Sequence, residues 1–232
     1  MRYHEVLDEL RSRASPSDVE GMARFGIATW RALGGSNVTY LRTVAKRIGK
    51  DHRLAGQLWR SKIHEARILA ALVDDPAEVT EGQMEAWAAD FDSWDVVDNC
   101  CGSLLDRTPF AWRKAEEWSA REQEFVKRAG FALMAYLAVH DKEAPDRAFE
   151  RFLPLIEREA GDPRNYARKA VNWALRQIGK RNPALNRKAI ATARRIHRTG
   201  PRAARWVASD ALRELSSERV QARLRVRRPP DR

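Results

Sequence analysis

Carboxylates and aromatic residues are concentrated in one segment of an otherwise basic chain, residues 91–101. If this segment is helical, Trp94 and Asp98 share one face, because residues four apart are neighbours on a helix. A tryptophan face attracts cations and a carboxylate stabilises developing positive charge, so this pair could act on a substrate that becomes positive. From spacing alone, a structural interpretation is favoured, in which Asp92 or Ser93 caps a helix, Trp94 is core and Asp98 forms an ion pair.

A second aromatic residue of interest, Trp173, lies in the segment 165–176. This segment carries Arg168, Lys169 and Arg176 and no acidic residue. A tryptophan among cations suits a nucleic-acid-binding face, where bases stack on aromatic rings. A core tryptophan with solvated arginines behind it fits the same pattern equally well.

Several kinds of chemistry are missing from the sequence. It contains no Walker loop, no dinucleotide-binding glycine motif, no His-Glu-x-x-His helix and no zinc deaminase motif, so we expect neither a metal nor an organic cofactor. The five histidines lack the spacing of metal ligands, and we expect surface or packing roles for all of them: His4, His52, His64, His140 and His197.

The charge is distributed very unevenly. The chain has a net charge of +11, yet residues 163–232 carry 20 Lys and Arg against 4 Asp and Glu, whereas residues 1–162 carry 23 against 28. Such a basic segment favours a polyanionic partner, because each neutralised phosphate releases condensed counterions. The charge by itself also allows an acidic membrane surface or an acidic protein.

Helical patterns recur along the whole chain, and no alternating run bounded by hairpin turns indicates a strand. Four helix starts are indicated by capping residues, at Thr80, Ser119, Asp162 and Asn182. Amphipathic segments of helical spacing are joined by short breaks, as in HEAT or armadillo repeats. We therefore predict an all-α superhelical stack of antiparallel helix pairs with a concave basic face, although a globular bundle remains an alternative. One domain is expected over residues 1–222, followed by a frayed basic tail at 223–232.

The compartment follows from what the sequence contains. Hydrophobic residues make up 44% of the chain, but no run approaches the roughly 20 apolar residues of a membrane span. The first residues mix charges and do not form a secretory signal. Cys100 and Cys101 are adjacent and suit neither a disulfide framework nor zinc, so we expect buried thiols in the cytoplasm. We expect no membrane partner and a monomer.

Three segments together resemble the AlkD family of bacterial DNA alkylation-repair glycosylases. They are Trp94-Asp95-Val96-Val97-Asp98, the segment from Phe125 to Ala129, and the segment from Lys169 to Arg176, in the family's order and at similar intervals. The resemblance implies HEAT-like repeats that hold duplex DNA and remove 3-alkyladenine and 7-alkylguanine without a metal or cofactor. Two departures are Phe125, where tryptophan is common in the family, and a short region before the first clear repeat.

The resemblance also assigns roles to individual residues and changes the preferred interpretation of Trp94, Asp98 and Trp173 from structural to functional. Trp94 and Trp173 correspond to the two aromatic residues beside the damaged nucleotide, Asp98 to the catalytic carboxylate and Arg128 to an arginine that contacts the DNA backbone. Further basic residues complete the expected DNA-binding set: Lys127, Arg168, Lys169, Arg176, Lys180 and Arg181.

The chemistry implied by the resemblance needs few groups. A purine alkylated on a ring nitrogen is already positive and leaves without protonation, so one carboxylate is enough to stabilise the sugar cation and orient water. The sequence shows no obvious lid or pocket loop of the kind that base-flipping enzymes use. Two other functions stay open, namely a non-catalytic binder of damaged or branched DNA and a helical-repeat scaffold for an acidic protein.

Overall fold

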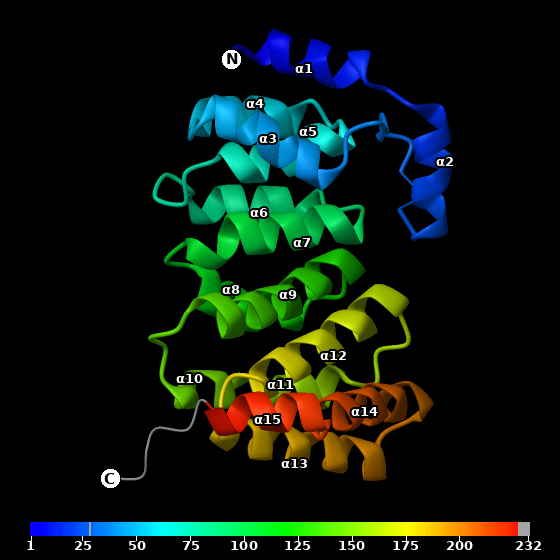
Figure 1. Ribbon diagram of the computed structural model, residues 1–232, viewed down its shortest axis with the longest axis vertical. Helices are drawn as coiled ribbons and strands as arrows, with labels where there is room; N and C mark the ends of the chain where they lie inside the picture. The colour runs from blue at the N-terminus through cyan, green and yellow to red at the C-terminus, as the bar shows by residue number, and fades with distance from the viewer. Residues whose placement is uncertain (28, 227–232) are drawn as a thin grey trace. The chain divides into compact units, whose positions relative to one another are not determined.

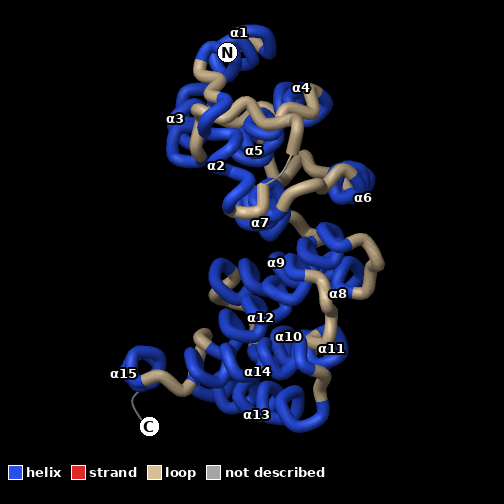
Figure 2. Tube along the Cα trace, turned by 90° about the vertical axis from the view of Figure 1, so that its right-hand side faces the viewer, coloured by secondary structure: helices blue, strands red, loops and turns tan. Residues whose placement is uncertain are grey.

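The computed structural model describes residues 1–27 and 29–226, and all regular structure within these ranges is helical (Figure 2). The prediction of an all-α protein is therefore confirmed. Contacts along the chain divide it into two compact units, Met1–Phe110 and Ala111–Arg232. The concave basic face expected of the whole chain stays a prediction.

The first unit contains seven α-helices and one 3-10 turn among its described residues (Figure 1). These are α1 (Tyr3–Ser12), α2 (Pro16–Arg24), α3 (Val38–Ile48), α4 (His52–Arg60), α5 (His64–Val73), α6 (Glu81–Ala89), α7 (Trp94–Ser103) and the 3-10 turn η1 (Leu105–Arg107).

Helix α5 is the centre of this first unit. Nine of its ten residues are buried, and it packs against α3, α4 and α7. A helix that is buried on nearly every side needs neighbours all round, which explains why α5 is the most apolar stretch of this unit. Beside it, the rings of Trp59 on α4 and Trp87 on α6 stack in parallel with centroids 4.1 Å apart.

The second unit contains eight helices within the part of the chain that is described (Figure 1). They are α8 (Ala111–Ser119), α9 (Glu124–His140), α10 (Asp146–Glu150), α11 (Phe152–Glu159), α12 (Asn165–Gly179), α13 (Pro183–Thr199), α14 (Arg202–Leu215) and α15 (Glu218–Val226).

Helix α9 has the same central place in the second unit. It packs between α8 and α12, and most of its residues are buried. Gly130 allows the close approach to α8, because a Cβ atom at this position would lie 2.4 Å from the backbone nitrogen of Ser119. Helix α12 then packs against α13 and α14, so that successive helices cover one another's apolar stripes.

Two of the four helix starts expected from capping residues are confirmed. Thr80 caps α6 by accepting a hydrogen bond from the Gln83 amide, and Asn182 caps α13 by accepting one from Leu185. The prediction at Ser119 is wrong because this residue ends α8, and α9 begins five residues later at Glu124.

The start expected at Asp162 is displaced. Helix α12 begins at Asn165, and the Asp162 side chain accepts from the Arg164 amide while its carboxylate also pairs with Lys127. The capping residue is thus used in the turn before the helix and in an ion pair, so the helix begins later than the proline pattern suggests.

The predictions for the two cysteines and for the C-terminal segment are confirmed in part. Cys100 and Cys101 are buried thiols on α7, as expected. Helix α15 continues to Val226 and buries Leu224, so residues 223–226 of the expected tail are helical, while 227–232 lie outside the described residues. Within the described part of the chain, no helix is both long and apolar enough to span a membrane.

Candidate functional site

The first unit contains Trp94 and Asp98, both half-buried and one turn apart on α7. Trp94 is the first residue of the helix, and its indole Nε1 donates a hydrogen bond of 3.0 Å to the backbone carbonyl of Phe25. Phe25 directly follows α2, so the loop between α2 and α3 fixes the orientation of the indole. The helix places the Asp98 carboxylate on the same side as Trp94.

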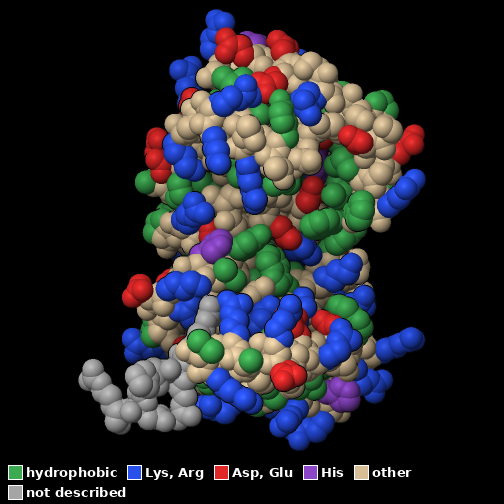
Figure 3. Space-filling view, viewed as in Figure 1, with side chains coloured by type: hydrophobic (Ala, Val, Ile, Leu, Met, Phe, Trp, Pro, Cys, Tyr) green, Lys and Arg blue, Asp and Glu red, His purple; other side chains and the backbone are tan. Residues whose placement is uncertain are grey.

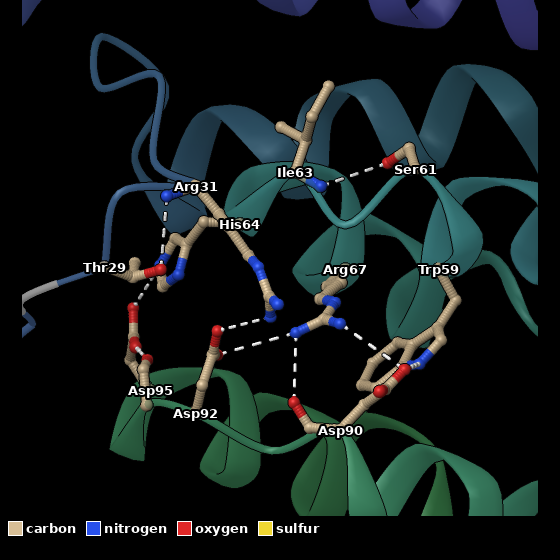
Figure 4. A network of polar contacts seen from close by, with 11 residues as sticks. Thr29, Arg31, Trp59, Ser61, Ile63, His64, Arg67, Asp90, Asp92 and Asp95 are labelled. Carbon is tan, nitrogen blue, oxygen red and sulfur yellow. Dashed lines mark hydrogen bonds and ion pairs between the residues drawn. The ribbon is translucent and has the colours of Figure 1, made fainter.

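The turn that precedes α7 is held by a network of charged side chains around the buried Arg67 (Figure 4). Asp92 pairs with Arg31 at 2.8 Å and with Arg67 at 3.5 Å. Arg67 lies on α5 and its side chain is 1% exposed, and it also bonds to the backbone carbonyl of Asp90 at 3.1 Å. Burial lowers the pKa of Arg67 even though Asp92 and Asp90 oppose the change.

A second buried pair connects α5 to α7. His64 is 2% exposed, and its Nε2 lies 2.8 Å from the Asp95 carboxylate, which also accepts a hydrogen bond from the Ser93 hydroxyl (Figure 4). Burial opposes the charged imidazole, but the hydrogen bond and charge of Asp95 outweigh it, so the pKa of His64 is raised. The pKa of Asp95 is lowered, because the contacts with His64 and Ser93 outweigh its own burial.

These two networks were not predicted from the sequence. The expectation of a packing role fits His64, but its partner Asp95 is 31 residues away, and Asp92 was considered only as a helix cap. Ser93 does occupy the position before α7, although its hydroxyl bonds to Asp95 rather than to a backbone amide. The networks position the helix that carries Trp94 and Asp98.

The second unit contains Trp173, which is half-buried on α12. Its ring packs edge-on against Tyr136 of α9, with centroids 5.0 Å apart and an interplanar angle of 82°. Arg128, also on α9, is 6% exposed, and its Nη1 donates to the backbone carbonyl of Tyr166 at 3.0 Å. The arginine expected at the DNA backbone therefore also joins α9 to α12.

Most of the other basic residues expected to bind DNA have partners within the second unit. Lys127 pairs with Glu159 at 2.5 Å and with Asp162 at 3.3 Å. Arg176 and Lys180 share Glu214 at 2.5 and 2.6 Å. Such pairs reduce the net positive charge that these side chains offer to a phosphate.

The three remaining members of the predicted set differ in their surroundings. Arg181 donates to the carbonyls of three residues, Ala138, Lys142 and Ala144, and lies over the ring of Phe149. Arg168 is half-buried with its guanidinium 5.0 Å from the ring centre of Trp206, and Lys169 is exposed. Of the seven basic residues predicted to bind DNA, Lys169 is exposed, and the other six are buried or half-buried. A role of each in DNA binding stays a prediction.

Many exposed cations lie on the later helices, for which the sequence indicated only a net positive charge. In Figure 3, Lys and Arg side chains gather on the face where α12 and α14 lie. The exposed arginines of α13, α14 and α15 include Arg187, Arg194, Arg198, Arg202, Arg205, Arg219 and Arg223. The charge excess of residues 163–232 was the sequence signal for these arginines as a group.

Comparison with protein families gives a match over nearly the whole chain. Residues 6–215 match the model of the DNA alkylation repair enzyme family. The chain belongs to this family. The resemblance to AlkD glycosylases that the three sequence segments indicated is thereby confirmed at the level of the family.

Two similar proteins extend the comparison. This member of the DNA alkylation repair enzyme family is 23% identical over 197 residues to the uncharacterized protein Lin0241 of Listeria innocua serovar 6a, covering 84% of this chain and 86% of the relative. A solved structure matches 97% of this chain and 96% of its own with a TM-score of 0.76 and 18% identity. That protein is described as one of a new family related to the HEAT-like repeat DNA glycosylases with affinity for branched DNA structures. The likeness confirms a HEAT-like repeat fold.

Proposed function

We propose that this protein binds double-stranded DNA and hydrolyses the N-glycosidic bond of positively charged alkylated purines, 3-alkyladenine and 7-alkylguanine. The observation that carries the proposal is the placement of Asp98 one turn after Trp94 on α7, a helix whose N-terminal turn is fixed by the pairs of Arg31 and Arg67 with Asp92. Membership of the DNA alkylation repair enzyme family and the excess of exposed cations on the later helices support it.

The proposed reaction uses the positive charge that the lesion already carries. The bond between C1′ and the base nitrogen breaks with its electron pair passing to the base, which leaves as a neutral molecule while the deoxyribose becomes cationic. The Asp98 carboxylate stabilises that cation and orients the water that attacks C1′. The attacking water then releases a proton to the solvent and leaves a hydroxyl group on C1′. The Trp94 face adds cation–π stabilisation, of the order of 0.5 to 2 kcal/mol.

The second unit has a binding role in this proposal. We propose that Trp173 contacts the DNA as the second aromatic residue, and that Arg128, Lys127, Arg168, Lys169, Arg176, Lys180 and Arg181 contribute to the potential that attracts phosphates. Contacts with phosphates fix the position of the DNA without reading its sequence. The protein acts as a monomer in the cytoplasm and needs no metal or cofactor in this scheme.

One experiment tests the activity directly. The protein is incubated with duplex DNA that has been treated with a methylating agent, and released bases are measured by mass spectrometry. Release of 3-methyladenine and 7-methylguanine that falls by about 10²-fold or more with Asp98→Asn supports the proposal. Tight DNA binding without release of any base contradicts it.

A second function has a specific observation in its favour. The solved structure with a TM-score of 0.76 belongs to a protein described as having affinity for branched DNA structures. A non-catalytic binder of damaged or branched DNA on the same fold is therefore the alternative. A carboxylate beside the proposed DNA contact Trp94 favours the enzyme, because a negative charge at that place weakens the binding of a polyanion.

A further inference from the structure

The second unit contains an exposed tryptophan that no sequence motif singled out. Trp206 lies on α14 and is 44% exposed. Helix α14 packs through a stripe of smaller apolar residues, Ala204, Val207, Ala208, Ala211 and Leu215, all of which are buried. The large ring therefore lies beside the apolar stripe of its helix rather than in it, and the packing of α14 does not depend on it.

The ring of Trp206 lies against a cation from the neighbouring helix. The guanidinium carbon of Arg168, on α12, is 5.0 Å from the ring centre, which is within the range of a cation–π contact. The Nε of Arg168 is buried and has no hydrogen-bond partner within the described structure, and an aromatic face is a weak acceptor for such an N–H group. The two terminal nitrogens are not among the buried atoms that lack a partner, and they bond to no described residue. They are therefore open to a ligand.

The cations around this pair have no carboxylate partner among the described residues. Lys169 follows Arg168 on α12, and Arg202 and Arg205 precede Trp206 on α14; all three are exposed. The first turns of α12 and α14 contain no acidic residue. Lys and Arg side chains gather over these two helices in Figure 3. This end of the helix pair thus presents four positive charges beside one exposed ring.

The other end of the same two helices has compensated charges. Arg176 and Lys180 of α12 both pair with Glu214 of α14. Between the two ends, the Asn172 side chain donates to the Val207 carbonyl at 3.2 Å. These bonds join residues in the same order along both helices, so α12 and α14 are parallel. The unpaired cations lie at the N-terminal end of the pair, and the ion pairs lie toward its C-terminal end.

We infer that Trp206 holds the guanidinium of Arg168 in place for a phosphate of the DNA backbone. The inference rests on the proposed function and adds a positioning residue to its DNA contacts. A planar guanidinium stacks on an aromatic face while the N–H groups at its edge stay free for phosphate oxygens. An unrestrained arginine loses side-chain freedom when it binds, so a ring that already restrains it makes the contact less costly.

The charges around the pair favour a chain of phosphates as the partner. Several cations without acidic neighbours suit a polyanion, because each neutralised phosphate releases counterions. The position on α12 fits the same partner, since Lys169 lies one turn before Trp173 on the same helix face. A DNA strand that contacts Trp173 therefore follows α12 toward Arg168 and the ring of Trp206.

A double-mutant cycle tests whether the ring acts through the arginine. Binding of an undamaged paired duplex to Trp206→Leu, Arg168→Gln and the double variant is measured by fluorescence anisotropy at several salt concentrations. Trp206→Leu should weaken binding by about twofold to fivefold and leave the salt slope unchanged, because the charge of Arg168 remains. Arg168→Gln should weaken binding more and lower the slope by about 1. Adding Trp206→Leu to Arg168→Gln should have no further effect.

Two control variants accompany the cycle. Trp206→Phe keeps an aromatic face for the guanidinium and should retain most of the parent's affinity. Arg213→Gln removes a cation from the same helix, two turns after Trp206, where it pairs with Asp210. This variant should lower the affinity less than Arg168→Gln does, because its positive charge is already compensated. Melting curves check that every variant is folded.

The outcomes separate this inference from the proposed function. An equal loss of affinity on Trp206→Leu with and without Arg168 shows that the ring acts independently and overturns the inference. Unchanged binding by Arg168→Gln overturns it as well. A parent that shows the expected coupling but releases no alkylated base keeps the inference and overturns the proposed glycosylase activity. A parent that binds no duplex overturns both.

Discussion

Trp94 and Phe25 are joined by a hydrogen bond of 3.0 Å from the indole Nε1 to the backbone carbonyl, across 69 residues of sequence. This bond connects the first residue of α7 to the loop after α2. A change in that loop should therefore alter the orientation of the indole beside the proposed catalytic carboxylate.

Duplex binding should weaken steeply with salt. If the exposed cations of the second unit make roughly five to nine phosphate contacts, the log–log slope of affinity against salt should be about −4 to −8. Fluorescence anisotropy with a labelled undamaged duplex at several salt concentrations measures this slope. A slope near zero would remove DNA from the proposed function.

Arg128 and Lys169 should behave differently although both are expected to contact DNA. Lys169 is exposed, so Lys169→Ala should reduce the salt slope by about 1 without changing the melting temperature. Arg128 is buried and bonds to the Tyr166 carbonyl, so Arg128→Ala should also lower the free energy of unfolding by about 1 to 3 kcal/mol. Urea unfolding beside the binding assay separates the effects, and an unchanged stability of Arg128→Ala contradicts the structural part.

Gly130 should tolerate no side chain. In Gly130→Ala the new Cβ meets the backbone of α8, 2.4 Å from the nitrogen of Ser119 and 2.8 Å from the carbonyl carbon of Trp118. Neither atom can move without shifting the helix, so the free energy of unfolding should fall by about 1 to 3 kcal/mol. Gly21→Ala is the control and should be neutral or slightly stabilising, since it lies on an open helix face. Equal stability of the two variants would contradict the close approach of α8 and α9.

The capping residues show which helix starts can be predicted from local sequence. Asn182 was correctly predicted to cap α13 because the bond to the Leu185 amide is local. Ser119 has the same kind of pattern, but it is buried at the end of α8 where Gly130 of α9 passes close by, and this packing overrides the local preference.

In the candidate site, too, local features could be predicted from the sequence and contacts between distant helices could not. The spacing of Trp94 and Asp98 was enough to place both on one helix. The pairing of His64 with Asp95 depends on the packing of α5 against α7, and no local sequence pattern shows which helices pack together.

The buried pair of His64 and Asp95 should make stability depend on pH. The raised pKa of His64 adds stability that is complete below its unfolded value of about 6.5 and is lost as pH rises through the folded value. The lowered pKa of Asp95 adds stability above its unfolded value of about 3.9, which is lost as pH falls through the folded value. The pair thus stabilises most between these two unfolded values.

Urea unfolding of the parent and of His64→Gln, at pH 5.5, 7.0 and 8.5, measures this contribution. The parent should be more stable than the variant at pH 5.5, and the difference should shrink as pH rises. A difference that is constant over this range would show that His64 does not change its protonation as the protein unfolds.

Asp98→Asn is the sharpest test of the proposed mechanism, because it keeps the shape of the side chain and removes its negative charge. Asp98 is half-buried on α7, so the loss of charge-stabilisation should reduce release of 7-methylguanine by about 10²-fold or more, or about 3 kcal/mol. Affinity for the duplex should stay close to that of the parent, and a melting curve of the variant checks that it is folded. Trp94→Ala is the comparison: it should reduce the rate less, and it should lower the melting temperature because the bond to Phe25 is lost. An Asp98→Asn variant that releases the base as fast as the parent would end the catalytic assignment and leave a DNA-binding protein of the same fold.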